Sequence, residues 1–129
     1  MSGPVRAGMV QHPRDVAFDY QRFRRAFCEK DVDAWLGFFT EDAKWIEYRH
    51  TKPPRDPNVM RGREEIEEHI RLVADSPVEF EMSDEVIGDE RAAFRVTCAL
   101  PGGRRIIEHV IVDLEDGRIT RQVDVEAWD

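Results

Sequence analysis

The chain has 129 residues, of which 19 are basic and 27 acidic, so that its formal net charge at pH 7 is −8. This length suits one domain with its own hydrophobic core and excludes two domains. The negative charge argues against nucleic acid or an anionic membrane surface as a partner. No apolar run approaches the roughly 20 residues of a membrane-spanning helix. Prolines and glycines make residues 1–14 a loose N-terminal segment, and the domain is expected at 15–129.

The two cysteines point to a cytoplasmic protein. Cys28 and Cys98 are too far apart in the sequence to form a metal-binding or redox motif. We interpret both as reduced thiols of the core, which fits a reducing compartment. The first residues also lack the apolar stretch of a signal peptide.

Helices are expected first along the chain. One is predicted from its N-cap Asp15 to about residue 27. Its apolar stripe, at helical spacing, comprises Val16, Tyr20, Phe23 and Phe27. A second helix begins after Asp31 and reaches about Phe39 or Thr40. A third covers residues 63–74, with glutamates near its N-terminus, where they favour the helix dipole.

Strands dominate the remainder. One strand is predicted at 43–50, where aromatic and β-branched residues are frequent, and prolines make 51–61 a loop. Four more strands are expected at 78–87, 92–100, 104–114 and 118–128. Because the turns between them are tight, these four should form an antiparallel meander. The order of elements predicts an α+β fold, in which three helices cover one face of a bent sheet and leave a pocket between the layers.

Three segments of the chain carry a family resemblance. Residues 27–43 hold a small acidic turn, a short helix and the motif F-x-x-D-A, and residues 61–66 read R-G-R-E-E-I. Residues 107–119 form a hairpin pattern that leads to Asp124. In this order the segments resemble the nuclear transport factor 2-like superfamily, and within it the SnoaL-like polyketide cyclase and ketosteroid isomerase branch. The resemblance implies a cone-shaped fold with three N-terminal helices on a curved antiparallel sheet that encloses a pocket. It also implies a homodimer.

Asp124 and His109 are the first candidate site residues. A two-residue turn at Asp116–Gly117 sets His109 opposite Asp124, with Gln122 on the same face. A slip of one residue would pair Glu108 with Asp124 instead. A carboxylate beside an imidazole fixes its tautomer, and either group can move a proton near neutral pH. The alternative is a pair that only stabilises a solvated face of the sheet.

The resemblance implies roles for these and other residues. In SnoaL-like cyclases an aspartate in the last strand, at the position of Asp124, is the general acid or base, with a histidine in the preceding strand. In ketosteroid isomerases the proton-shuttling carboxylate lies where Glu47 stands, while Phe23 replaces an oxyanion-stabilising tyrosine. Epoxide hydrolases of the superfamily have an arginine at the position of Arg95, but their second carboxylate would fall at Thr97.

Aromatic side chains are the other expected components of the pocket, although plain core residues of the same kind would show the same pattern. The expected lining residues are Phe23, Phe27, Trp35, Trp45, Tyr48, Arg95 and Gln122. The acidic stretch at 64–69, which includes His69, is interpreted as a solvated, ion-paired helix face.

Two classes of function remain open at this point. In the first, the protein is an isomerase or cyclase, less readily an epoxide hydrolase, that transfers a proton next to a carbonyl of a small apolar molecule. Asp124 or Glu47 would be the base, and His109 or Tyr48 would stabilise the oxygen. In the second, the pocket binds a small ligand without chemistry, or the dimer is a partner module. No metal or nucleotide motif is recognised, and no cofactor is expected.

Overall fold

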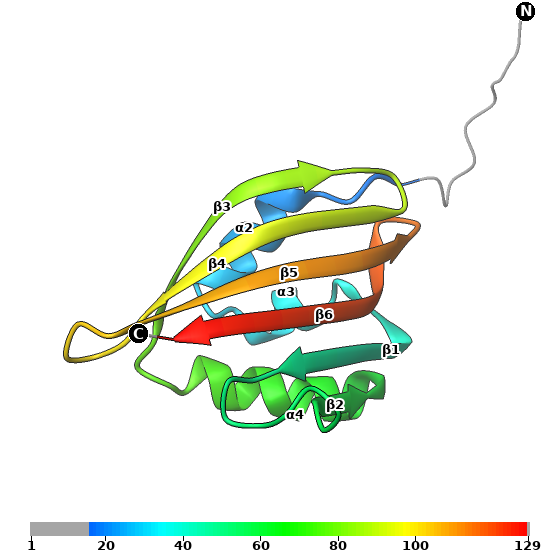
Figure 1. The fold of residues 1–129 in the computed structure, drawn as a ribbon. Coiled ribbons are helices and arrows are strands. Elements are labelled where there is room, and N and C mark those ends of the chain that lie inside the picture. The colour runs from blue at the N-terminus through cyan, green and yellow to red at the C-terminus, as the bar shows by residue number, and fades with distance from the viewer. Residues whose placement is uncertain (1–15, 129) are drawn as a thin grey trace, which may run out of the picture.

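A computed structural model describes residues 16–128, so the predicted loose segment at 1–14 and the predicted cap Asp15 lie outside the described residues. Figure 1 shows the helices and strands in space. They are α2 (Tyr20–Cys28), α3 (Val32–Leu36), β1 (Phe39–Tyr48), β2 (Asn58–Arg61), α4 (Gly62–Ala74), β3 (Glu79–Ile87), β4 (Arg91–Ala99), β5 (Arg105–Glu115) and β6 (Arg118–Trp128). The predicted α+β fold is confirmed.

The first two helices are shorter than predicted. Helix α2 begins at Tyr20, because Asp19 is its N-cap and accepts a hydrogen bond from the backbone N–H of Arg22 at 3.1 Å. Helix α3 begins after Asp31, as predicted, and ends at Leu36. The prediction that it reaches Phe39 or Thr40 is wrong, since the chain already pairs with β6 there: the N–H of Ile119 donates to the carbonyl of Phe38.

The strands form one six-stranded sheet in the order β2-β1-β6-β5-β4-β3. The predicted antiparallel meander is confirmed for β3 to β6. The sheet as a whole is mixed, however, because β1 lies parallel to β6. The prediction of a loop throughout 51–61 is wrong at its end, where β2 pairs antiparallel with β1.

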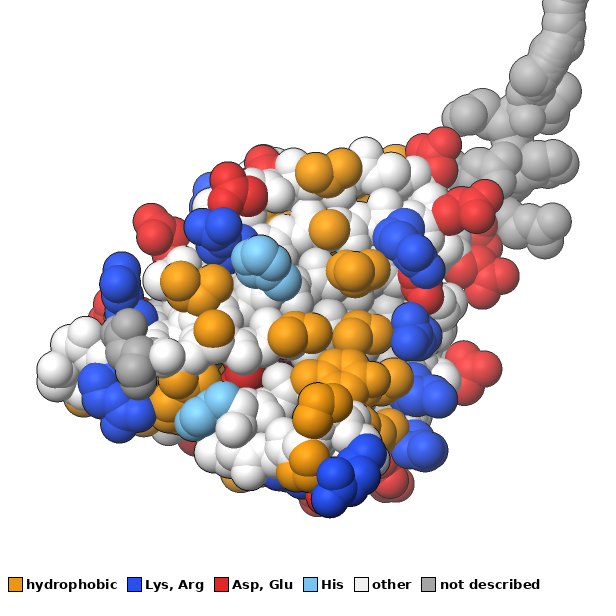
Figure 2. Space-filling model, in the orientation of Figure 1, with side chains coloured by type: hydrophobic (Ala, Val, Ile, Leu, Met, Phe, Trp, Pro, Cys, Tyr) orange, Lys and Arg blue, Asp and Glu red, His pale blue; other side chains and the backbone are white. Residues whose placement is uncertain are grey.

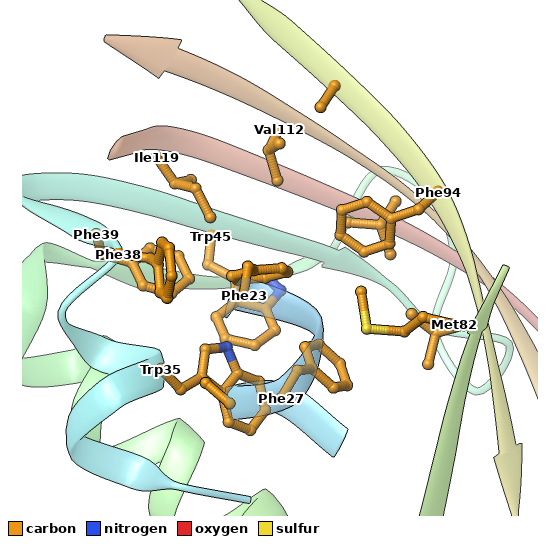
Figure 3. Close-up of a cluster of buried hydrophobic side chains, with 14 of the residues drawn as sticks. Phe23, Phe27, Trp35, Phe38, Phe39, Trp45, Met82, Phe94, Val112 and Ile119 are labelled. Carbon is orange, nitrogen blue, oxygen red and sulfur yellow. The ribbon is translucent and has the colours of Figure 1, made fainter. Parts of the chain in front are cut away.

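The core lies between the sheet and the helices. Helices α2 and α3 cover one face of the sheet, and α4 lies along its β1 end (Figure 1). Figure 3 shows rings from both helices packed against side chains of the sheet; Phe23, Trp35, Val112 and Ile119 are fully buried. None of the helices within residues 16–128 is long and apolar enough to span a membrane. Cys28 and Cys98 are free thiols.

The hairpin of β5 and β6 decides where the candidate site residues point. Asp116 and Gly117 both have positive φ, at 51° and 76°, as the predicted two-residue turn requires. Beyond the turn Glu115 pairs with Arg118 and Leu114 with Ile119, but the next pair is Asp113 with Arg121. Thr120 is therefore an extra residue, a β-bulge, which shifts the register of everything beyond it.

The bulge overturns the predicted pairing of His109 with Asp124. The residue opposite Asp124 is Val110, and His109 lies opposite Val125. The alternative slip, with Glu108 opposite Asp124, is also wrong, because Glu108 pairs with Glu126. In the structure the hydroxyl of Thr120 donates a hydrogen bond to the carbonyl of Asp113 at 3.3 Å. The sequence offers no strong signal for a bulge at this position.

Gly117 is expected to be sensitive to substitution. A Cβ there would come within 2.9 Å of the carbonyl oxygens of Val16 and Ala17, in addition to the strain of positive φ. Gly102, with φ of +91°, has open space around it. We expect Gly117→Ala to lower the free energy of unfolding by about 2 kcal/mol and Gly102→Ala by about 1 kcal/mol. Urea denaturation of both variants checks this, and equal losses would contradict it.

Candidate functional site

A cavity of about 290 Å³ opens between α4, the first two helices and the concave face of the sheet. Its wall is mostly apolar and includes Phe27, Trp35, Trp45 and Phe80. Its polar lining includes Glu47, Arg49, His69, Glu108, Asp124 and Glu126. An apolar cleft with a few converging polar groups is the usual form of a small-molecule site.

Asp124 is the most deeply buried carboxyl of the cavity, with 3% of its surface exposed. Its Oδ2 accepts a hydrogen bond from Nε1 of Trp45 at 2.7 Å, and its Oδ1 accepts one from Nε2 of Gln122 at 3.0 Å. Burial raises the pKa of Asp124 well above its ordinary value, and the nearby carboxyl groups of Glu108 and Glu47 raise it further. The two hydrogen bonds act in the opposite direction but do not compensate. Asp124 is thereby suited to hold a proton.

Glu47 lies beside Asp124, because the two residues are partners across the parallel strands β1 and β6. Its Oε2 is 2.9 Å from Nε2 of His69, which reaches it from α4. The other oxygen, Oε1, is buried and has no hydrogen-bond partner; Nη1 of Arg49 stays 3.8 Å away. Burial would raise the pKa of Glu47, but the contact with His69 and the charge of Arg49 outweigh it, so the pKa is lowered.

His69 is held from two sides. Besides its contact with Glu47, its ring stands edge-on against the Trp45 indole, with the centroids 4.8 Å apart and the planes at 87°. Trp45 therefore contacts both His69 and Asp124, because its Nε1 also donates a hydrogen bond to Asp124.

A second pair of carboxyl groups lies farther along the sheet. Glu108 and Glu126 are direct partners across β5 and β6. Glu126 accepts a hydrogen bond from Nε1 of Trp128 at 2.8 Å and lies 3.2 Å from Nδ1 of His50. Burial, together with the charges of Glu47 and Glu126, raises the pKa of Glu108 to about 7.

The structure brings together only part of the predicted site. Glu47, Asp124, Phe27, Trp35 and Trp45 line the cavity. Phe23 is buried in the core behind it, and Gln122 is fully buried and reaches the site through its hydrogen bond to Asp124.

Three predicted residues lie on the other face of the sheet. His109 and Arg95, partners across β4 and β5, are exposed on the convex face, and Tyr48 points the same way. The predicted use of His109 or Tyr48 at the reacting oxygen therefore finds no support in the geometry. For His109 the reason is the regular alternation of β5, in which Leu114, Val112 and Val110 point inward. For Tyr48 it is the alternation of β1 relative to the buried Glu47.

His69 is the main residue that sequence reasoning missed. The interpretation of 64–69 as a solvated face holds for Glu67, which pairs with Arg71 at 2.7 Å, but is wrong for His69. A signal was present, because Ile66, His69, Ile70 and Val73 follow the spacing of a buried helix stripe. Within residues 16–128 no group of three or more His, Cys, Asp or Glu side chains is arranged to hold a metal ion.

The site can move protons with its own side chains. Neighbouring groups whose pKa values are pushed apart are suited to act as acid and base, and here the pKa of Glu47 is lowered while that of Asp124 is raised. Glu47 would be the base, with its Oε1 free to accept a proton, and the neighbouring Asp124 would be the protonated acid.

Comparisons with known proteins give the family and the fold that this chain shares with other proteins. A family model described as a SnoaL-like domain matches residues 20–122. No curated protein matches the chain. An NTF2-like protein of unknown function from Mesorhizobium loti is 20% identical, with a TM-score of 0.73 over 84% of this chain and 87% of its own.

Two further solved structures share the fold. A proposed ketosteroid isomerase from Kribbella flavida is 16% identical, with a TM-score of 0.65 over 85% of this chain and 74% of its own. A proposed polyketide cyclase from Sinorhizobium meliloti is 18% identical, with a TM-score of 0.64 over 81% of this chain and 91% of its own. At these identities the likeness concerns the fold, and function depends on the site.

Proposed function

Because this chain belongs to the SnoaL-like domain family, we propose that it is an isomerase or cyclase that transfers a proton next to a carbonyl of a small apolar molecule. The observation that carries the proposal is the pair formed by Glu47 and His69 beside the buried Asp124. The apolar wall of the cavity suits the body of such a substrate, and the acid and base lie on neighbouring strands.

The proposed reaction starts at Glu47. Its Oε1 removes a proton from the carbon next to the carbonyl, and His69 keeps the carboxylate ionised and oriented. The oxygen of the carbonyl becomes an enolate, which receives a hydrogen bond or the proton of Asp124. When the first proton returns to another carbon, the carbonyl re-forms, Asp124 recovers any proton that it gave, and an isomer results. When the enolate carbon instead attacks a second carbonyl, a ring forms, the new alkoxide takes the proton held by Glu47, and the first carbonyl re-forms as Asp124 recovers any proton that it gave.

The test is exchange of carbon-bound protons. Incubation of the protein in D₂O with apolar ketones, such as a steroid enone or an aromatic diketone, should incorporate deuterium next to the carbonyl, seen as loss of the proton NMR signal. The same ketones with heat-denatured protein are the control. Absence of exchange for ketones that bind in the cavity would overturn the proposal.

We also propose that two copies of the chain associate through the convex face of the sheet. Apolar side chains that α2 and α3 do not cover gather there, as Figure 2 shows, and Ile111 and Val125 are 44% and 55% exposed. A sheet that is apolar on both faces favours a cover on the second face. A second copy would place the same strands against each other.

Sedimentation tests this association. The protein should sediment at about twice its chain mass of 15.1 kDa at micromolar concentration. Val125→Glu should sediment at the mass of one chain while the fold, followed by circular dichroism, stays intact. Sedimentation of the wild type as a single chain would overturn the proposal.

A further inference from the structure

One carboxyl group of the cavity has no partner among residues 16–128. Glu47 has His69, Asp124 has Trp45 and Gln122, and Glu126 has Trp128 and His50. Within residues 16–128, Glu108 forms neither a hydrogen bond nor an ion pair, although it lines the cavity and is mostly buried. Because its carboxyl group opens to the cavity, a ligand there can supply the partner that the described residues do not.

The surroundings of Glu108 favour a cation. Glu126 lies directly opposite on the next strand, so two carboxyl groups face the same part of the cavity. The guanidinium that lines the cavity, that of Arg49, forms ion pairs with Glu126 at 3.7 Å and with Glu47 at 3.8 Å, without hydrogen bonds, and forms none with Glu108. A positive group with several N–H donors would donate hydrogen bonds to both Glu108 and Glu126.

The remaining features restrict the cation further. The walls include Phe27, Trp35 and Phe80, so the positive group must be small and attached to an apolar body. The net charge of −8 also favours the approach of a cation over that of an anion.

We propose that the cavity takes a substrate whose apolar body carries a protonated primary amine, held by Glu108 and Glu126. This inference rests on the proposed function only in that both place the substrate in the same cavity. It concerns binding, and the chemistry at Glu47 and Asp124 is tested separately.

The experiment compares three probes of equal size by isothermal titration calorimetry: 3-phenylpropylamine, 3-phenylpropan-1-ol and 3-phenylpropionate. At pH 8 the amine should bind the wild type at least about tenfold more tightly than the alcohol, since a charge-assisted hydrogen bond replaces a neutral one. The propionate should bind most weakly. Equal affinity of the alcohol or the propionate, or failure of the amine to bind, would overturn the proposal.

The pH dependence identifies Glu108. Its pKa of about 7 means that affinity for the amine should rise about tenfold from pH 6 to pH 8, as the carboxyl group ionises. Other titratable or charged groups face the same cavity, namely Glu47, Arg49, His69, Cys98, Asp124 and Glu126. Glu108→Gln separates them, because it should lose both the preference for the amine and most of this rise.

A matched variant completes the design. Glu115→Gln, exposed on the same strand β5, should bind all three probes as the wild type does. If Glu108→Gln keeps the preference for the amine, the proposal fails. Asp124→Asn should retain that preference, so a protein that binds the amine but exchanges no carbon-bound protons would refute the proposed function and leave the amine site standing.

Discussion

Replacing Glu47 by Gln is expected to slow deuterium exchange into a bound ketone by about 10³-fold, the effect of losing a positioned general base. The amide keeps the size of the side chain and can still contact His69, so ligand affinity should change little. Exchange rates by NMR and ligand affinity by calorimetry separate the two effects. A ketone that exchanges equally fast with Glu47→Gln would show that another group is the base.

A control lies on the same helix as His69. Glu68 is exposed on α4 and lines no part of the cavity, so Glu68→Gln should exchange at the wild-type rate.

Because His69 lowers the pKa of Glu47, His69→Gln should move the acid limb of the pH–rate profile to higher pH. A purely structural role of His69 would reduce the rate without moving that limb.

Replacing Glu108 by Gln is expected to stabilise the fold at pH 8 by about 2–3 kcal/mol. The pKa of Glu108 is raised from its ordinary value of 4.5 to about 7 in the folded chain, chiefly by burial. As the pH rises from 4.5 to 7, the unfolded chain releases this proton while the folded chain retains it. The folded state therefore loses stability across this interval, and a neutral amide avoids the loss.

The measurement is urea denaturation at two pH values. At pH 4.5 Glu108 is protonated in the folded chain and half protonated in the unfolded chain, so Glu108→Gln should differ little from the wild type. Glu115→Gln, exposed on the same strand, should change the free energy of unfolding by less than about 0.5 kcal/mol at either pH. An equal gain for Glu108→Gln at both pH values would contradict ionisation as the cause.

Most of the fold follows from local signals in the chain. Asp31 caps α3, and the positive φ values of Asp116 and Gly117 fit the short turn that their residue types favour. Glu47 was selected by the family resemblance, because the proton-shuttling carboxylate of ketosteroid isomerases has this place after the F-x-x-D-A motif. These signals depend on neighbours within a few positions, which is why they can be recognised in one sequence.

The composition of the site was decided by contacts between distant segments. The parallel pairing of β1 with β6 sets Glu47 beside Asp124, and the packing of α4 against β1 brings His69 to Glu47. The bulge at Thr120 turns Asp124 to the inner face, whereas the unbroken alternation of β5 leaves Glu108 facing the cavity and His109 outside. Hydrophobic patterning alone does not specify the register of such a strand where both of its faces carry apolar and polar residues.

The opposite pKa shifts of Glu47 and Asp124 have the same origin. Both are carboxyl groups on neighbouring strands, and no local pattern distinguishes an acid from a base among them. The difference arises because His69 and Arg49 surround one with positive charge, whereas burial and two acidic neighbours dominate the other. The sequence thus singled out Glu47 and Asp124 as candidates, and only the packing of distant elements decides which of the two carboxyl groups holds a proton.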